Sequence, residues 1–528
     1  MNTKATTIVA LFTCFFVFGK SQVPAKLDSS FLSIGEFWDG YLNQYQSIVA
    51  SVSLPDSTLV YVAQITAGTG PSAMIKLKTD GSIDSSFGTS GVFTYQINGV
   101  SPTVKGIHYV AGKLYLSGKL GREKFVTRIN INGSIDATFG NFGSRTINYA
   151  TPIVDITNSI TFDQFNNCFI GARFTDLASS VTKLTVTKID TNGNIALGFG
   201  TSGRADFVLP SGSVSAFSDL AIDSNQNIIA AACGSSAGNN VVLLVKFNQN
   251  GVLDNGFNSL GYKEWSFQGA DTYQVATNEI LTDKNKIIVA GEYLVSGILN
   301  AFVFKLKPNG EYDSTFATNG VLNYHNSGLN INFSEMLYSS NGELFISGSA
   351  GNTTDSYFSL LKLLPDGTID SVFANNGMFL NQVGMRWESN GAECMTVYKD
   401  DKVFLGGNSS DCDGGTCYFT SSMCRIITKL EEISDTTTSD TTHTSIEDFE
   451  KLGSNVVLFP NPLKKGEKLY IKSKAVVKNV KIYSLTGKEL KTSLRNNSIQ
   501  IQDITQPGIY IALVQTGDIQ LHQKIIIQ

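Results

Sequence analysis

The sequence predicts an all-β protein, with a seven-bladed β-propeller closed by its N-terminal strand and followed by a small C-terminal β-sandwich. Three observations predict this fold: a motif that returns every 52 to 60 residues, strand-like segments that fill each interval, and a change of composition after residue 430. A fixed period of this length is typical of repeat architectures. The repeat therefore decides the fold class, although 528 residues could also hold several ordinary domains.

The motif is clearest at residues 80–91, which read Asp-Gly-Ser-Ile-Asp-Ser-Ser-Phe-Gly-Thr-Ser-Gly. Asp-Gly or Asn-Gly suits a tight turn, because both residue types tolerate positive φ. The next Asp is expected to cap a single helical turn and the Phe to enter the core. Ala196 replaces that Asp in one copy, which favours a structural role over ligand binding. The anchor phenylalanines are Phe31, Phe87, Phe139, Phe199, Phe257, Phe316 and Phe373.

Four strands are expected in each repeat, for example at residues 106–110, 113–118, 125–129 and 144–148. Antiparallel units of this kind, repeated radially, form a β-propeller. Third strands are expected to end at Leu77, Ile129, Ile189, Phe247, Leu306, Leu363 and Leu430, and the first six of these stand ten residues before an anchor Phe. The seventh has no anchor after it, so the truncated motif at residues 27–31 is predicted to close the last blade. The propeller is thus placed at residues 22–430.

The recurrence Gly-x-Ile-Asp-x-x-Phe-Gly-x-x-Gly resembles the delta-60 repeat family of predicted β-propellers, over residues from about 27 to 430. This resemblance implies the propeller fold and no particular activity.

Residues 1–21 have the layout of a secretory signal peptide, with Lys4, an apolar run over residues 8–18 and small residues before Gln22. That run is too short to span a bilayer. No other apolar stretch reaches that length, so no transmembrane segment is expected in the mature chain. The net charge of −5 gives no reason to expect nucleic acid or an anionic membrane as a partner.

Six cysteines follow the signal peptide. Cys412 and Cys417 flank a flexible Asp-Gly-Gly-Thr loop and are the predicted disulfide, in keeping with export. Cys394 and Cys424 share a repeat and are a candidate second pair, whereas Cys168 and Cys233 are open to a role as buried small hydrophobes. The pairing of these four stays open. No zinc site is expected, because no Cys-x-x-Cys pair is present and no His stands near them.

Residues 431–453 are rich in Thr, Ser and Asp and are predicted to form a linker. Two Asp-Thr-Thr triplets within them are similar to O-glycosylation sites of secreted Bacteroidota proteins, although an unmodified linker explains them equally well.

Residues 454–528 alternate apolar and polar residues between turn signals, as in a compact β-sandwich. Pro-Asn-Pro at 460–462, Tyr-x-x-x-Gly-Lys at 483–488 and Pro-Gly-x-Tyr at 507–510 together resemble the type A C-terminal sorting domain of the type IX secretion system. The resemblance implies that the secretion machinery is a partner. It also implies passage through the periplasm to the outer cell surface or the medium.

One candidate site emerges when the repeats are aligned on their second strands. The head of the innermost strand is then occupied by Gly106, Ser159, Asp219, Glu279, Glu335 and Cys394 in successive blades. Equivalent positions form a ring around the propeller axis, so Asp219, Glu279 and Glu335 are expected near the channel mouth. We predict that they bind a divalent cation such as calcium, the alternative being solvated turn residues. No other cofactor is expected.

No catalytic residues can be assigned from the sequence. Gly-Ser-Ser-Ala-Gly at 234–238 matches a nucleophile motif but lies between two expected strands, and the chain has only four histidines. The predicted function is a secreted or cell-surface module that binds an unknown extracellular glycan or protein. The alternative is a propeller enzyme, a lyase or a glycoside hydrolase, that acts on extracellular polysaccharide.

Overall fold

The computed structural model describes most of the chain as strands and turns, with no helix among the described residues. These are residues 25–32, 36–38, 46–65, 71–149, 160–176, 179–266, 275–283, 285–326, 328–352, 355–383, 389–398, 402–413, 416–428, 457–459, 463, 468–472, 477–484, 489–495, 498–501, 508–516 and 519–527. The chain divides into two compact units, residues 1–431 and 432–528. The expected signal peptide and linker lie outside the described residues.

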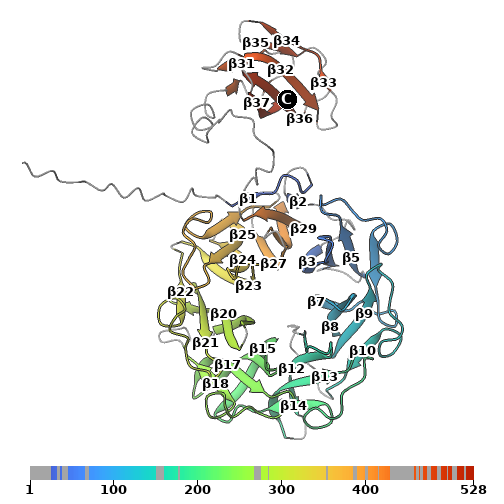
Figure 1. Cartoon of the computed structure of the whole chain (residues 1–528), viewed down its shortest axis with the longest axis vertical. Coiled ribbons are helices and arrows are strands. Elements are labelled where there is room, and N and C mark those ends of the chain that lie inside the picture. Colours follow the sequence, from blue (N-terminus) through green and yellow to red (C-terminus); the bar gives the residue numbers. More distant parts are fainter. Residues whose placement is uncertain are drawn as a thin grey trace, which may run out of the picture. The chain divides into compact units, whose positions relative to one another are not determined.

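The first unit is a seven-bladed β-propeller, whose sheets stand in a ring with the first strand of each at the centre (Figure 1). The first blade consists of β3 (Gln46–Ser53), β4 (Leu59–Ile65), β5 (Ser72–Leu77) and β6 (Val92–Tyr95). The second consists of β7 (Thr103–Val110), β8 (Lys113–Leu120), β9 (Glu123–Asn130) and β10 (Ser144–Ile147). The third consists of β11 (Ile160–Phe162), β12 (Cys168–Asp176), β13 (Val181–Ile189) and β14 (Arg204–Phe207).

The remaining blades repeat this antiparallel order. The fourth consists of β15 (Gly212–Ile222), β16 (Ile228–Ser236), β17 (Asn239–Phe247) and β18 (Tyr262–Trp265). The fifth consists of β19 (Val275–Asp283), β20 (Lys286–Val295), β21 (Ile298–Leu306) and β22 (Val321–Tyr324). The sixth consists of β23 (Asn330–Tyr338), β24 (Leu344–Gly351), β25 (Ser356–Leu363) and β26 (Met378–Asn381). The seventh contains β27 (Ser389–Val397), β28 (Val403–Asp413) and β29 (Thr416–Ile427).

The N-terminal segment completes the seventh blade, as predicted. Strands β1 (Lys26–Leu27) and β2 (Glu36–Trp38) both pair antiparallel with β29, beside which they lie in Figure 1. Leu27 stands opposite Ile426, so Ile426 is the equivalent of the earlier third-strand ends. The third strand of the seventh blade was expected to end at Leu430. This expectation is wrong, because β29 ends at Ile427.

Every anchor phenylalanine is buried, with at most 3% of its surface exposed. The turn before it is a single turn, in which the amide of Phe87 donates to the carbonyl of Asp84. A second turn follows, in which Gly91 donates to Phe87. Positive φ at Gly88 and Gly91 excludes a helical continuation. The Asp does cap the first turn, because its carboxylate accepts from the Ser86 amide at 3.1 Å.

Among the described residues, the motif also fastens blades together at six junctions. The residue after the anchor donates its amide to the carbonyl of the following repeat's turn, for example Gly140 to Asn192 at 2.7 Å. A Cβ added at Gly81 would lie 2.8 Å from the ring of Phe31, so that position needs glycine for room as well as for its positive φ. The same amide bond is made by Leu32 to Asp80, Gly88 to Asn132, Gly200 to Asn250, Asn258 to Asn309 and Ala317 to Asp366.

Each third strand carries a basic residue that sequence reasoning missed, and in four blades this residue lies over an anchor ring. Arg128, for example, lies 4.9 Å from the ring centroid of Phe139 and 2.9 Å from the Asp136 carboxylate. Where Ala196 replaces the anchor Asp, Lys188 pairs with Asp163 instead, at 3.1 Å. The cation is thus always neutralised, which explains why the anchor Asp can be lost. The equivalent residues are Lys76, Arg128, Lys188, Lys246, Lys305, Lys362 and Arg425.

The second unit is a small β-sandwich of two four-stranded sheets around one apolar core. One sheet has the order β30 (Val457–Phe459), β31 (Leu469–Lys472), β35 (Ser498–Ile501), β34 (Thr492–Arg495). The other has the order β33 (Glu489–Leu490), β32 (Val477–Ser484), β36 (Gly508–Thr516), β37 (Ile519–Ile527). Leu469 and Ile499 of the first sheet share the core with Ile482 and Ala512 of the second.

We predict that Asp28→Asn destabilises the propeller strongly. Asp28 Oδ2 accepts from Arg425 Nε at 2.8 Å, and both residues are buried. Burial alone would raise the pKa of Asp28, but hydrogen bonds from Ser30 and the charges of Arg425 and Lys402 hold that pKa below its ordinary value. Removing the charge leaves Arg425 buried without its carboxylate, which costs about 3 kcal/mol.

Urea unfolding of both proteins measures this loss. Glu311→Gln is the control, because it breaks the Lys307–Glu311 pair in which both side chains are largely exposed, and such pairs contribute little. Equal stability of Asp28→Asn and the control would show that the ring does not depend on this closure.

Candidate functional site

The first strands of all seven blades line a cavity of about 490 Å³ on the propeller axis, which we call the axial cavity. Its walls combine apolar side chains such as Phe162 and Leu337 with hydroxyl groups such as Thr282. The lining residues belong to the C-terminal halves of these strands: Ser51–Ser53, Ile107–Val110, Ile160–Phe162, Asp219–Ile222, Ile280, Thr282, Glu335, Leu337 and Met395–Val397.

The sequence-predicted ring positions share one backbone feature. In six blades the first strand has a register shift directly before this position, between Val104 and Gly106 in the second blade and between Phe333 and Glu335 in the sixth. Such a bulge adds one residue to the strand, so the side chains after it point to the opposite face of the sheet from the one that the strand's alternation would give. Gly106, Asp219, Glu279, Glu335 and Cys394 all follow this shift, whereas Ser159 lies outside the described residues.

Two of the predicted carboxylates line the axial cavity, and both bind the next blade. Asp219 Oδ2 accepts from the Ile280 amide at 2.9 Å, and its Oδ1 accepts from Leu220. Glu335 Oε2 accepts from the Met395 amide at 2.5 Å. Each acceptor therefore satisfies an amide on the inner edge of the neighbouring sheet, an edge that has no strand partner. The two carboxylates hold blades together, a role that the alignment alone did not reveal.

The uncharged forms of Glu335 and His108 both predominate near pH 7. Burial raises the pKa of Glu335 to about 8, the Met395 amide opposes this shift, and the charge of Asp219 adds to it. Burial likewise lowers the pKa of His108 to about 4. The ring of His108 lies 5.8 Å from that of Phe162 on the same wall. The cavity thus offers a protonated carboxyl and a neutral imidazole, which can donate and accept hydrogen bonds without a charge on either group.

Calcium binding by Asp219, Glu279 and Glu335 stays a prediction. Among the described side chains, no three His, Cys, Asp or Glu residues form a group that could hold a metal ion. The side chain of Glu279 lies outside the described residues, although its backbone occupies the equivalent place in β19.

The predicted disulfide also stays a prediction. The backbone places Cys412 directly opposite Cys417 in the β28–β29 hairpin, but their side chains lie outside the described residues. The candidate pair of Cys394 and Cys424 is wrong, because both are buried and form no disulfide. Cys168 and Cys233 are also buried outside any disulfide, which agrees with their interpretation as small hydrophobic residues.

Comparison with known protein families agrees with the two units. Residues 457–528 match the family described as a secretion system C-terminal sorting domain. Residues 227–257 and 285–316, which span parts of the fourth and fifth blades, match a β-propeller domain of unknown function, DUF5122. The protein is a β-propeller with a type IX secretion sorting domain. Its sorting domain directs it to the cell surface or the medium.

Solved structures add little to this assignment. A virginiamycin B lyase from Staphylococcus aureus is 9% identical, with a TM-score of 0.41 over 74% of this chain and 98% of its own. The polysaccharide lyase Uly1 is 10% identical, with a TM-score of 0.42 over 74% and 91%. Drosophila Semaphorin 2a is 10% identical, with a TM-score of 0.38 over 93% and 97%. Likenesses this distant carry no argument about activity.

A search of proteins with curated functions found no match to the exported propeller. None of its described residues belongs to a helix long and apolar enough to cross a membrane.

We predict that the stability of the propeller falls as pH rises from about 6.5 to 8, and that Glu335→Gln removes part of this fall. Below about pH 6.5 the buried His108, whose pKa is lowered to about 4, opposes the effect, because the unfolded chain binds that proton more tightly than the folded chain does. The unfolded chain ionises Glu335 near its ordinary pKa of 4.5, whereas the folded chain keeps the proton up to about 8. Between these values the unfolded state therefore gains stability with pH, by up to about 1.4 kcal/mol per pH unit. Urea unfolding across this range measures the effect.

Glutamine keeps an oxygen that can accept from Met395, so the variant should be more stable than wild type at pH 8. Glu311→Gln, at an exposed site, should keep the wild-type slope. An unchanged slope in Glu335→Gln would show that Glu335 is ionised in the folded protein.

Deletion of residues 454–528 should leave a folded propeller in the periplasm. The two compact units have separate apolar cores, so the propeller does not need the sorting domain to fold. Cell fractionation locates the truncated protein, and thermal denaturation compares its melting temperature with that of the full chain. Efficient appearance of the truncated chain at the surface would contradict the sorting role.

Proposed function

We propose that the exported propeller is a binding module that takes part of an extracellular glycan into its axial cavity. The observation that carries this proposal is the lining of the cavity, in which hydroxyl groups and uncharged polar groups alternate with apolar and aromatic side chains. Ligand sites of about 300 to 1,000 Å³ are typical of proteins, and this cavity falls within that range. Asp219 and Glu335 are engaged with backbone amides, which favours binding over chemistry.

A glycan array probed with the mature protein tests the proposal. Leu337→Trp should fill the cavity and reduce binding at least tenfold, because Leu337 lines it. Ile298→Trp is the matched control, since Ile298 is 46% exposed and lies outside the cavity. Absence of any bound glycan, or equal binding by Leu337→Trp and wild type, would overturn the proposal in favour of a protein ligand.

A second candidate function is an enzyme that acts on extracellular polysaccharide, and Glu335 favours it. A carboxyl whose pKa is raised by burial can serve as a general acid near neutral pH, with Asp219 as a nearby carboxylate. A polysaccharide degradation screen with wild type and Glu335→Gln decides between the two functions. Degradation that is lost in the variant would favour the enzyme.

Calcium remains a proposed ligand of the three ring carboxylates. A cation bound only by the folded state would raise the melting temperature with its concentration. We expect such a shift in wild type and its loss in the double variant Glu279→Gln, Glu335→Gln. An equal shift in both proteins, or none in either, would leave the carboxylates with the interblade role alone.

A further inference from the structure

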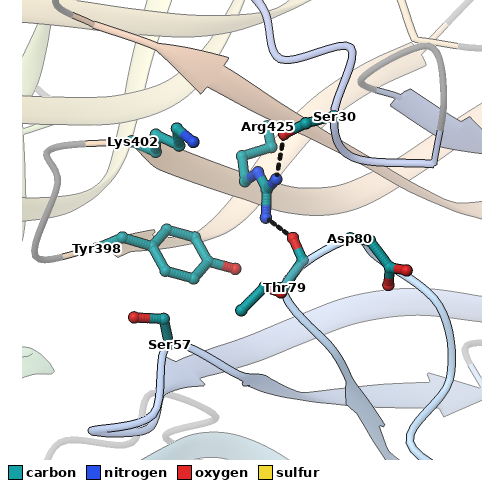
Figure 2. Close-up of a pocket in the computed structure, with 7 residues that line it drawn as sticks. All are labelled: Ser30, Ser57, Thr79, Asp80, Tyr398, Lys402 and Arg425. Carbon is teal, nitrogen blue, oxygen red and sulfur yellow. Dashed lines mark hydrogen bonds between the residues drawn. The ribbon is translucent and has the colours of Figure 1, made fainter. Parts of the chain in front are cut away.

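A second cavity, of about 290 Å³, lies where the seventh blade meets the first, and we call it the seam pocket (Figure 2). It shares no lining residue with the axial cavity. Its walls come from the turns of both blades and from the N-terminal anchor: Ser30, Ser57, Thr79, Asp80, Tyr398, Lys402 and Arg425.

Hydrogen bonds join the corresponding loops at two other junctions. Between the third and fourth blades, Gln226 accepts from the Gln164 amide at 3.0 Å across the loops that join first and second strands. Between the fourth and fifth blades, Ser224 donates to Asn285 at 2.6 Å. At the seam, Ser57, Tyr398 and Lys402 of the corresponding loops line the pocket.

Tyr398 occupies a place that other blades give to a carboxylate. Its amide closes the loop on the Lys402 carbonyl, just as the amide of Asp223 closes its loop on Asn227. In the fourth blade Asp223 pairs with the third-strand cation Lys246 at 3.1 Å. In the seventh blade the ring of Tyr398 lies 5.6 Å from the equivalent cation, Arg425. The substitution replaces a negative charge with an aromatic ring and a hydroxyl group.

The cations of the pocket share a counterion. Asp28 Oδ2 lies 2.8 Å from Arg425 Nε and 3.6 Å from Lys402 Nζ. Arg425 also donates to the Thr79 carbonyl and to Ser30. The Lys402 amine is partly exposed, and it lies farther from the Asp28 carboxylate than Arg425 does. In Figure 2 the Tyr398 hydroxyl points toward the centre of the pocket and the Asp80 carboxylate points away from it.

We propose that the seam pocket binds the carboxylate of an acidic sugar. Lys402 pairs with the carboxylate, and the hydroxyl groups of Tyr398 and Ser57 bond to the sugar's own hydroxyls. The volume holds roughly ten waters at about 30 Å³ each, which is the room that a single sugar ring requires. This site is independent of the proposed axial ligand, because the two cavities have no residue in common.

Titration calorimetry of the mature protein with glucuronate tests the proposal, with glucose as the neutral comparison and inorganic sulfate as a second anion. We expect glucuronate to bind at least tenfold more tightly than glucose. Lys402→Gln should weaken glucuronate binding at least tenfold, and Tyr398→Phe should weaken it less while keeping the aromatic ring beside Arg425.

Lys286→Gln is the matched control, because Lys286 stands at the start of the second strand of the fifth blade, much as Lys402 stands directly before that of the seventh, and it pairs with Asp313 at 2.6 Å. This control should bind glucuronate as wild type does, and so should Leu337→Trp, which alters only the axial cavity. Equal affinity for glucose and glucuronate, binding of sulfate without glucuronate, or full binding by a folded Lys402→Gln would each overturn the proposal.

Discussion

The ring depends on the burial of every anchor phenylalanine. Four of these rings lie under a third-strand cation, and after six of the anchors the next amide bonds to the following repeat's turn. Phe139 shows all parts of this contact: Arg128 lies over its ring, and the following Gly140 donates to Asn192 of the third blade. The phenylalanine thus belongs to the core of its own blade and to the junction with the next. Spacing between blades is set by this contact, and the blades themselves are free to vary in their outer loops.

The seam is the one junction in which the parts of this contact come from opposite ends of the propeller. Phe31 and Asp28 arrive from the N-terminus, whereas Arg425 arrives from β29, 397 residues away from Asp28. Closing a long loop costs entropy that grows slowly with its length, so a few strong interactions can offset it. Arg425 supplies them by contacting the Phe31 ring, the Asp28 carboxylate and the Thr79 carbonyl. Closure therefore uses the same chemistry as every other junction.

Much of the fold could be predicted because the motif encodes local geometry that repeats. Blade number and N-terminal closure followed from the positions of the anchors. Phe31 has no third strand before it, and the third strand of the seventh blade has no anchor after it, so the two belong together. The capped turn before the anchor could be predicted from its Asp, whereas the second turn, with positive φ at Gly88 and Gly91, was not predicted. In the sequence, a Lys or Arg stands eleven residues before each of the six anchors from Phe87 to Phe373. Because Lys and Arg usually lie at the surface, this pattern did not predict a buried cation.

The candidate site was predicted only in part, because alignment gives equivalent positions and not the direction of their side chains. The bulge before Asp219 and Glu335 decides that direction, and nothing in residues such as Ser218 or Ser334 marks a bulge in advance. His108 was missed for the same reason, since it stands two residues beyond the ring position and only the register brings it into the cavity.

A symmetric scaffold therefore surrounds an asymmetric lining. The position that carries Asp219 and Glu335 in two blades is Gly106 in the second and Cys394 in the seventh, so the acids are gathered on one side of the axis. The interblade bonds of these acids do not explain the asymmetry, because the other junctions hold without them. An exposed charge could increase solubility anywhere on the surface. Glu335 differs, because burial raises the pKa of its carboxyl and fixes both its place and its hydrogen bond. Such a lining is what the ligand-binding role that we propose for the axial cavity requires, whereas the ring itself does not require it.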